Sequence, residues 1–220
     1  MNPLEETALI TLIFTILFGV FSIYHLLMYF VLKHKILLYY SLLIFGLAVH
    51  WSLYFFVDKT SETLASSIAS NLSLITAMTT TVGMLLFTRS YLNISRHSSP
   101  KLNTVFSAFI AIALVLGVLH IINFIFIKSE FLIHTLSLIA AILAFMAILL
   151  NILAGILMFN SHELNKYYLY SSIPIFLAAL LYIGAWLVMN SYTLDKTLIL
   201  FITSMLVAFQ LMLFSIIIGF

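Results

Sequence analysis

The chain of 220 residues contains no cysteine and very few charged side chains. Without cysteine it can form no disulfide, no thiol nucleophile and no thiolate-ligated metal site. Only 7% of the residues are charged and 64% are hydrophobic, which is far from the composition of a soluble domain. Lys, Asp and Glu are missing from every long apolar run. Their absence excludes a retinal Schiff base and counts against proton pumps and ion-coupled transporters that use intramembrane carboxylates.

Motifs of soluble enzymes are missing as well. The chain has no G-x-S-x-G, no H-E-x-x-H and no glycine-rich phosphate loop. Its net charge of +2 resides in short gaps, so there is no basic face for nucleic acid. We therefore predict no catalytic residues, no cofactor, no metal and no nucleic-acid partner. An intramembrane enzyme or a haem protein with two histidine ligands is the third-ranked alternative.

Seven long apolar runs are what the sequence does contain. Each is near or above the ~20 residues that an α-helix needs to cross the hydrocarbon core. Runs this long and apolar do not alternate as the strands of a membrane barrel do. The prediction is an all-α protein, a polytopic seven-transmembrane helix bundle that forms one domain over residues 1–220. Its helices are expected at 7–32, 36–57, 65–87, 104–127, 131–159, 167–189 and 198–220.

The charges in the gaps predict how the bundle is oriented. Gaps on one side hold Lys33, Lys35, Arg89, Arg96, Lys101 and Lys166 with one acid, Glu163, whereas the other side holds Lys59, Lys128 and Lys196 with six acids. Because Lys and Arg accumulate on the cytoplasmic side, we expect the N-terminus outside and the C-terminus in the cytoplasm of a bacterial inner membrane. Tyrosines near the inner boundary, Tyr40 and Tyr168 among them, are expected to form an interfacial belt.

Histidines are the only ionisable side chains expected within the membrane. At 1.5 Å per residue, His50 and His120 both lie roughly 20 to 25 Å above the inner ends of their helices. Membrane polar groups are costly unless they are paired or face a cavity. Two interpretations stay open, because each histidine can simply join helices through hydrogen bonds, or both can belong to an outward-facing ligand pocket. The residues predicted for that pocket are His50, Trp51, Asn71, His120, Asn123 and Trp186.

The third apolar run is the most polar and is expected to lie inside the bundle. Small residues recur along it at steps of four and three, which places them on one helix face. Either they allow tight packing against neighbouring helices, or they form a wall of a small polar cavity. The residues in question are Ala69, Ser73, Thr76, Thr80 and Gly83.

Two stretches resemble a known family. They are Gly19, Tyr24-His25-Leu26, Tyr29 and Leu38-Tyr39-Tyr40-Ser41-Leu42, and then Phe87-Thr88-Arg89-Ser90-Tyr91-Leu92 followed by Pro100. The first resembles the opening helices of the bacterial seven-transmembrane receptors with diverse intracellular signalling modules, and the second is similar to their F-x-R-x-aromatic-L signature. The resemblance implies a bundle that relays a signal to a cytoplasmic output such as a histidine kinase, a cyclase or a phosphatase. The chain departs from that pattern by lacking both an external sensor domain and an output domain.

The predicted function is a receptor-type transmembrane signal-transduction module, with a small-solute transporter or channel as the alternative. Arg89, Tyr91 and Pro174 are predicted as anchors of the inner boundary or as relay residues. The expected partners are the lipid bilayer, a C-terminal cytoplasmic signalling domain, and a small ligand or external sensor, with homodimer formation left open. The last apolar run ends without a polar flank, so we expect an excised membrane domain, and a small complete protein is the alternative.

Overall fold

The computed structural model describes residues 3–59, 64–188 and 196–219, and almost all of them are helical. Seven α-helices in this part of the chain are long and apolar enough to cross a membrane, which confirms the predicted all-α, seven-helix architecture. A π-helical turn, η1 (Asn123–Ile127), continues the fourth helix. The helices are α1 (Pro3–Leu32), α2 (Lys35–Lys59), α3 (Leu64–Tyr91), α4 (Pro100–Ile122), α5 (Glu130–Leu157), α6 (Glu163–Val188) and α7 (Lys196–Gly219).

Several helices are longer than the apolar runs from which they were predicted. Helix α3 continues past Phe87 to Tyr91, and α6 begins at Glu163, before the first residue of its apolar run. The backbone stays helical there because polar side chains such as Arg89 can reach water from the first or last turn. The hydrophobic pattern therefore marks the membrane-embedded length of each helix and not its full length.

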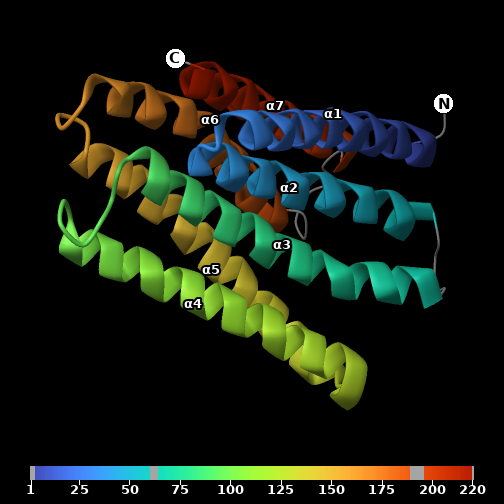
Figure 1. The fold of residues 1–220 in the computed structure, drawn as a ribbon. Coiled ribbons are helices and arrows are strands. Elements are labelled where there is room, and N and C mark those ends of the chain that lie inside the picture. The colour runs from blue at the N-terminus through green and yellow to red at the C-terminus, as the bar shows by residue number, and fades with distance from the viewer. Residues whose placement is uncertain (1–2, 60–63, 189–195, 220) are drawn as a thin grey trace.

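Helix α3 lies at the centre of the arrangement. In Figure 1, α1, α2, α3 and α4 follow one another side by side, and α5, α6 and α7 lie behind them. Helix α3 contacts α2, α4 and α5, whereas α7 contacts α6 and returns to α1. Half of the α3 span is buried, against 22% of the α4 span. The prediction that the third helix is an inner helix is confirmed.

Helices α2 and α3 approach each other so closely that two positions on their interface require glycine. A Cβ atom added at Gly83 would lie 2.7 Å from the backbone nitrogen of Leu43 and 2.8 Å from its Cα. A Cβ atom added at Gly46 would overlap Oγ1 of Thr80 and lie 3.0 Å from its backbone nitrogen. We call this interface the glycine seam. Small residues at such positions let two helix backbones meet, as in other membrane bundles.

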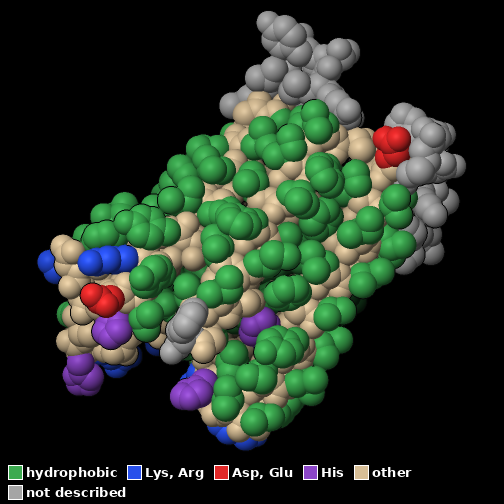
Figure 2. Space-filling model, turned by 90° about the horizontal axis from the view of Figure 1, so that it is seen from above, with side chains coloured by type: hydrophobic (Ala, Val, Ile, Leu, Met, Phe, Trp, Pro, Cys, Tyr) green, Lys and Arg blue, Asp and Glu red, His purple; other side chains and the backbone are tan. Residues whose placement is uncertain are grey.

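The outside of the bundle is apolar along its length. On α1, Ile16, Val20, Ile23, Leu27 and Val31 follow one another at steps of three and four and are all more than half exposed. Figure 2 shows that apolar side chains dominate one whole face, with Lys, Arg, Asp and Glu only near its periphery. This distribution is the one expected for helices surrounded by lipid.

Candidate functional site

Five aromatic side chains from four helices meet near the end of the bundle where α7 finishes. They are Tyr40 of α2, Phe87 and Tyr91 of α3, Tyr168 of α6 and Phe214 of α7, and we call them the aromatic cluster. Phe87 contacts all four other rings, at centroid distances between 4.9 and 6.3 Å. Phe214 lies 4.9 Å from Phe87, 5.5 Å from Tyr168 and 6.3 Å from Tyr40. Aromatic pairs at such separations add favourable energy beyond the area they bury.

Hydroxyl groups of the cluster connect the same helices. Tyr40 donates a hydrogen bond to the backbone carbonyl of Leu211, which joins α2 to α7. The hydroxyls of Thr88 and Tyr168 lie 2.6 Å apart and join α3 to α6, and Tyr91 donates to the carbonyl of Leu164 at 3.3 Å. Since a buried hydroxyl is costly without a partner, these bonds fix the rotation of each helix around the cluster.

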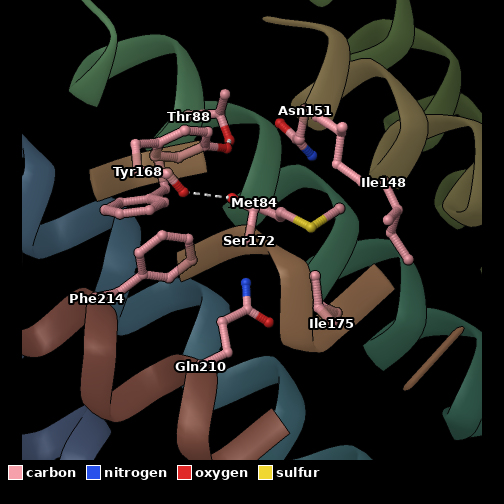
Figure 3. A pocket seen from close by; sticks show the side chains of 11 residues that line it. Met84, Thr88, Ile148, Asn151, Tyr168, Ser172, Ile175, Gln210 and Phe214 are labelled. Carbon is pink, nitrogen blue, oxygen red and sulfur yellow. Dashed lines mark hydrogen bonds between the residues drawn. The ribbon is translucent and has the colours of Figure 1, made fainter. Parts of the chain in front are cut away.

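A small cavity adjoins the cluster between α3, α5, α6 and α7 (Figure 3). Its polar lining consists of Thr88, Asn151, Tyr168, Ser172 and Gln210. Helical spacing explains how each helix supplies several groups, because residues three or four apart lie on one face. Tyr168 and Ser172 are such a pair on α6, and Gln210 and Phe214 are another on α7.

The cluster corrects one sequence-based expectation. Tyr40 and Tyr168 were expected in an interfacial belt, but they are 0% and 1% exposed and belong to the core. Their helices turn these side chains toward α7 and α3, whereas Tyr167 and Tyr170 on the other side of α6 stay exposed. A run of tyrosines near a membrane boundary therefore does not reveal which of them face lipid.

The residues predicted for an outward-facing pocket are only partly placed by the structure. His50 Nδ1 lies 3.2 Å from Oγ1 of Thr76 on α3, and Trp51 Nε1 donates to Oγ of Ser204 on α7 at 2.9 Å. His120 is buried on α4, and α3 lies between α2 and α4 (Figure 1). The side chains of Asn71 and Trp186 lie outside the described part of the structure.

Asn123, another residue predicted for that pocket, organises the turn between α4 and α5. It is buried, its Nδ2 donates to the carbonyl of Ser129, and its Oδ1 accepts from the Ser129 backbone N–H, both at 3.2 Å. Its own carbonyl accepts from the backbone N–H of Lys128. The ligand-binding role of this residue set stays a prediction.

Arg89 and Pro174 have defined surroundings. The Arg89 guanidinium donates to Oγ of Ser107 at 3.3 Å in an exposed position, so it links the ends of α3 and α4 through a hydroxyl group. Pro174 is buried inside α6. Because proline has no backbone N–H, the carbonyl one turn earlier, that of Tyr170, loses its usual helical partner.

The sequence analysis missed two residues of the site, because it searched for histidines, charged residues and small residues. Asn151 and Gln210 are 4% and 3% exposed, and both line the cavity. The signal that could have found them is their isolation, because each is a lone amide within a long apolar run. Membrane polar groups of this kind normally face the interior of a bundle.

The fold defines an integral membrane protein built from seven helices, with a polar and aromatic junction where α2, α3, α6 and α7 meet. The chain matches the family described as 7TM diverse intracellular signalling over residues 7–219, and it belongs to that family. It is thus a seven-transmembrane, receptor-type domain of signal transduction, and the resemblance carried by its first three helices is confirmed. No curated protein and no solved structure matches the chain.

Proposed function

We propose that this domain relays a signal from the outer half of the bundle to an output domain in the cytoplasm. The family match over nearly the entire chain carries the proposal. The charge distribution supports the direction, because the end of the bundle at which α7 finishes is the one with the cationic loops. In this proposal a ligand or an external sensor binds one arrangement of the helices more tightly than another, and the population shifts accordingly.

The aromatic cluster is the part of the bundle best suited to transmit such a shift. It joins α7 to α2 through Tyr40 and to α6 through the stacked rings of Tyr168 and Phe214. Phe214 lies five residues before Gly219, the last described residue of α7. A rotation of α7 in this region therefore has to break or remake contacts of the cluster, which is how a packed core can switch between discrete states.

A chimera tests the relay. A dimeric output enzyme, such as a diguanylate cyclase, is fused after Phe220 with zero to seven inserted alanines, and its activity is measured in cells. Each inserted residue rotates the output by about 100° relative to α7, so the activity should vary with a period of about 3.6 residues. Phe214→Leu should then change the activity of the chimera with the most active linker. Gly19→Ala should not, since no atom of the described residues lies within 4 Å of a Cβ atom at Gly19. Activity that is independent of linker length would contradict a relay through α7.

The outward pocket is tested in the same chimera. His50→Ala and His120→Ala are compared with the unchanged chain for their response to medium components or to an added external partner. Loss of response in folded variants would support the predicted ligand site. If both variants fold and respond normally, these histidines are packing residues, and sensing belongs to another part of the system.

The transporter alternative makes a different prediction. Vesicles that contain the purified domain would then accumulate or release a small solute faster than protein-free vesicles do. If such a flux is measured, and if the activity of the fused output enzyme does not depend on the number of inserted alanines, the transporter alternative would be favoured over the receptor proposal.

A further inference from the structure

A second and much larger cavity lies at the end of the bundle where α7 finishes, and we call it the end pocket. Its volume is about 480 Å³, which is within the range of sites that bind small organic ligands. The beginning of α2, the end of α3, the end of α7 and the α3–α4 and α5–α6 connections line it. In Figure 1 both connections project beyond the end of α7. The end pocket therefore lies at the level where the apolar spans end and where lipid headgroups begin.

Apolar and polar side chains reach the end pocket from different elements. Helices α2 and α7 contribute only isoleucines, namely Ile36, Ile217 and Ile218. The end of α3 and the two connections contribute every polar side chain of the lining, namely Tyr91, Asn93, Ser98, Ser161, His162 and Asn165. An occupant that touches all of these elements has to be amphipathic.

Hydrogen bonds within the protein hold the two connections in place. In the α3–α4 connection, Oγ of Ser98 donates to the carbonyl of Asn93 at 2.7 Å. In the α5–α6 connection, Nδ2 of Asn165 donates to the carbonyl of Met158 at 2.9 Å, and Oγ of Ser161 donates to the same carbonyl at 2.6 Å. Because these donors already have acceptors, the walls of the end pocket are formed before a ligand binds, as is usual for ligand sites.

Two other side chains of the lining keep a donor for an occupant. Nδ1 of His162 accepts from the backbone N–H of Leu164 at 3.3 Å, so the hydrogen of the neutral ring is on Nε2. Neither this N–H nor the side-chain amide of Asn93 has an acceptor among the described residues. Each connection thus offers one N–H donor, which suits an occupant that carries several oxygen atoms.

The charges around the end pocket favour an anion. None of the side chains that line it is acidic. Lys35, Arg96 and Lys166 each lie within two residues of a lining residue, and Nζ of Lys166 is 5.7 Å from the ring centroid of Phe159 in the α5–α6 connection. Glu163 is the one acid at this end of the described bundle, and it is exposed. Basic pockets between membrane helices are typical binding sites for anionic lipid headgroups.

We propose that the end pocket binds one anionic phospholipid, with its headgroup against the two connections and its hydrocarbon against α2 and α7. A phospholipid fits better than a water-soluble phosphate compound, which would leave the isoleucines of α2 and α7 without an apolar partner. Cationic loops alone would attract anionic lipids to the surface but would not select one position. The inference rests neither on the signalling role nor on the orientation, because both leaflets present headgroups at this level.

Native mass spectrometry of the purified chain in detergent tests the proposal by counting retained lipids. Phosphatidylglycerol and phosphatidylcholine with identical acyl chains are compared, and one phosphatidylglycerol should be retained at concentrations at which phosphatidylcholine is not. Phosphatidylglycerol should also raise the Tm, whereas glycerol phosphate at the same concentration should not. Equal retention of the two lipids, or retention of neither, would overturn the proposal. An equal rise in Tm with glycerol phosphate would assign the pocket to a water-soluble compound instead. These comparisons use the unchanged chain, so they decide the matter even if variants fail to fold.

His162→Asp tests the polar lining. Aspartate keeps an acceptor for the first turn of α6 and suits a helix N-terminus, but it adds a negative charge to the end pocket. The affinity for phosphatidylglycerol should fall by about fivefold or more. His97→Asp is the matched control, because it adds the same charge at the same end from an exposed residue that does not line the pocket. Its effect should be smaller, and an equal loss in both variants would refute the proposal in favour of general attraction by the cationic loops.

Ile217→Trp tests the apolar lining. The larger side chain fills part of the end pocket, so less phosphatidylglycerol should be retained. Ile216→Trp is the control, because Ile216 is 56% exposed on α7 and does not line the pocket. Retention should then match that of the unchanged chain. If Ile217→Trp also retains the lipid normally, the lipid binds elsewhere and the proposal is wrong.

Discussion

Gly83→Ala should destabilise the bundle by forcing α2 and α3 apart. The added Cβ atom would lie 2.7 Å from a backbone nitrogen of α2 and 2.8 Å from a backbone Cα. Ordinary contacts of this kind begin near 3.4 Å, so the two helices must separate by about 0.7 Å. Backbone atoms cannot rotate away as a side chain can, and overpacking of dense cores costs about 1 to 3 kcal/mol. We expect the upper part of that range for Gly83→Ala.

The assay is loss of helical circular dichroism on heating in detergent micelles. For a chain of this size, about 2 to 3 kcal/mol corresponds to a fall in Tm of about 4 to 12 °C. Gly19→Ala and Gly184→Ala are matched controls, because in the described part of the chain a Cβ atom at either position has no neighbouring atom within 4 Å. Alanine also has the higher helix propensity, so these controls should unfold at the temperature of the unchanged chain or above it. Equal Tm values for Gly83→Ala and both controls would refute the tight α2–α3 interface.

Three other predictions concern hydrogen bonds and orientation. Tyr40→Phe keeps the ring but removes the donor to an α7 carbonyl, so the free energy of unfolding should fall by about 0.5 to 1.5 kcal/mol, and an unchanged Tm would contradict that bond. Thr76→Val removes the hydroxyl 3.2 Å from His50 Nδ1 and should lower stability by about 1 kcal/mol in the same assay, an effect that should be smaller when His50 is already alanine, since only the bond of Thr76 to the Ser73 carbonyl is then lost. A reporter fused after Phe220 should be active in the cytoplasm and one inserted after Lys128 outside, and the opposite result would refute the proposed orientation.

The number and type of helices could be predicted from the sequence because lipid imposes a strong constraint. Every backbone polar group in the hydrocarbon core needs a partner, and long apolar runs leave only helices. The inner position of α3 was also predictable. Thr80 and Gly83 belong to its small-residue face, and both lie against α2 in the structure.

The rotation of the remaining helices could not be predicted in the same way. In water, the polar face of a helix identifies its exposed side, but in a bilayer both the lipid-facing and the core-facing sides are apolar. Tyr168 and Tyr170 are therefore indistinguishable in the sequence, although one is buried and the other exposed. The aromatic cluster depends on contacts between residues more than 100 positions apart, such as Tyr40 and Leu211, for which the local sequence holds no signal.

The glycine seam determines which parts of the bundle can slide. Sliding of α2 along α3 would carry the backbone at Leu43 away from Gly83 and onto residues that bear a Cβ atom, where no such approach is possible. Helices α2 and α3 therefore form a mechanically stiff pair that resists shear. The contacts of α7 with this pair include instead edge-to-face ring contacts and single hydrogen bonds, which small displacements can exchange one by one. In the proposed relay, α7 is therefore the helix that we expect to move against this fixed support.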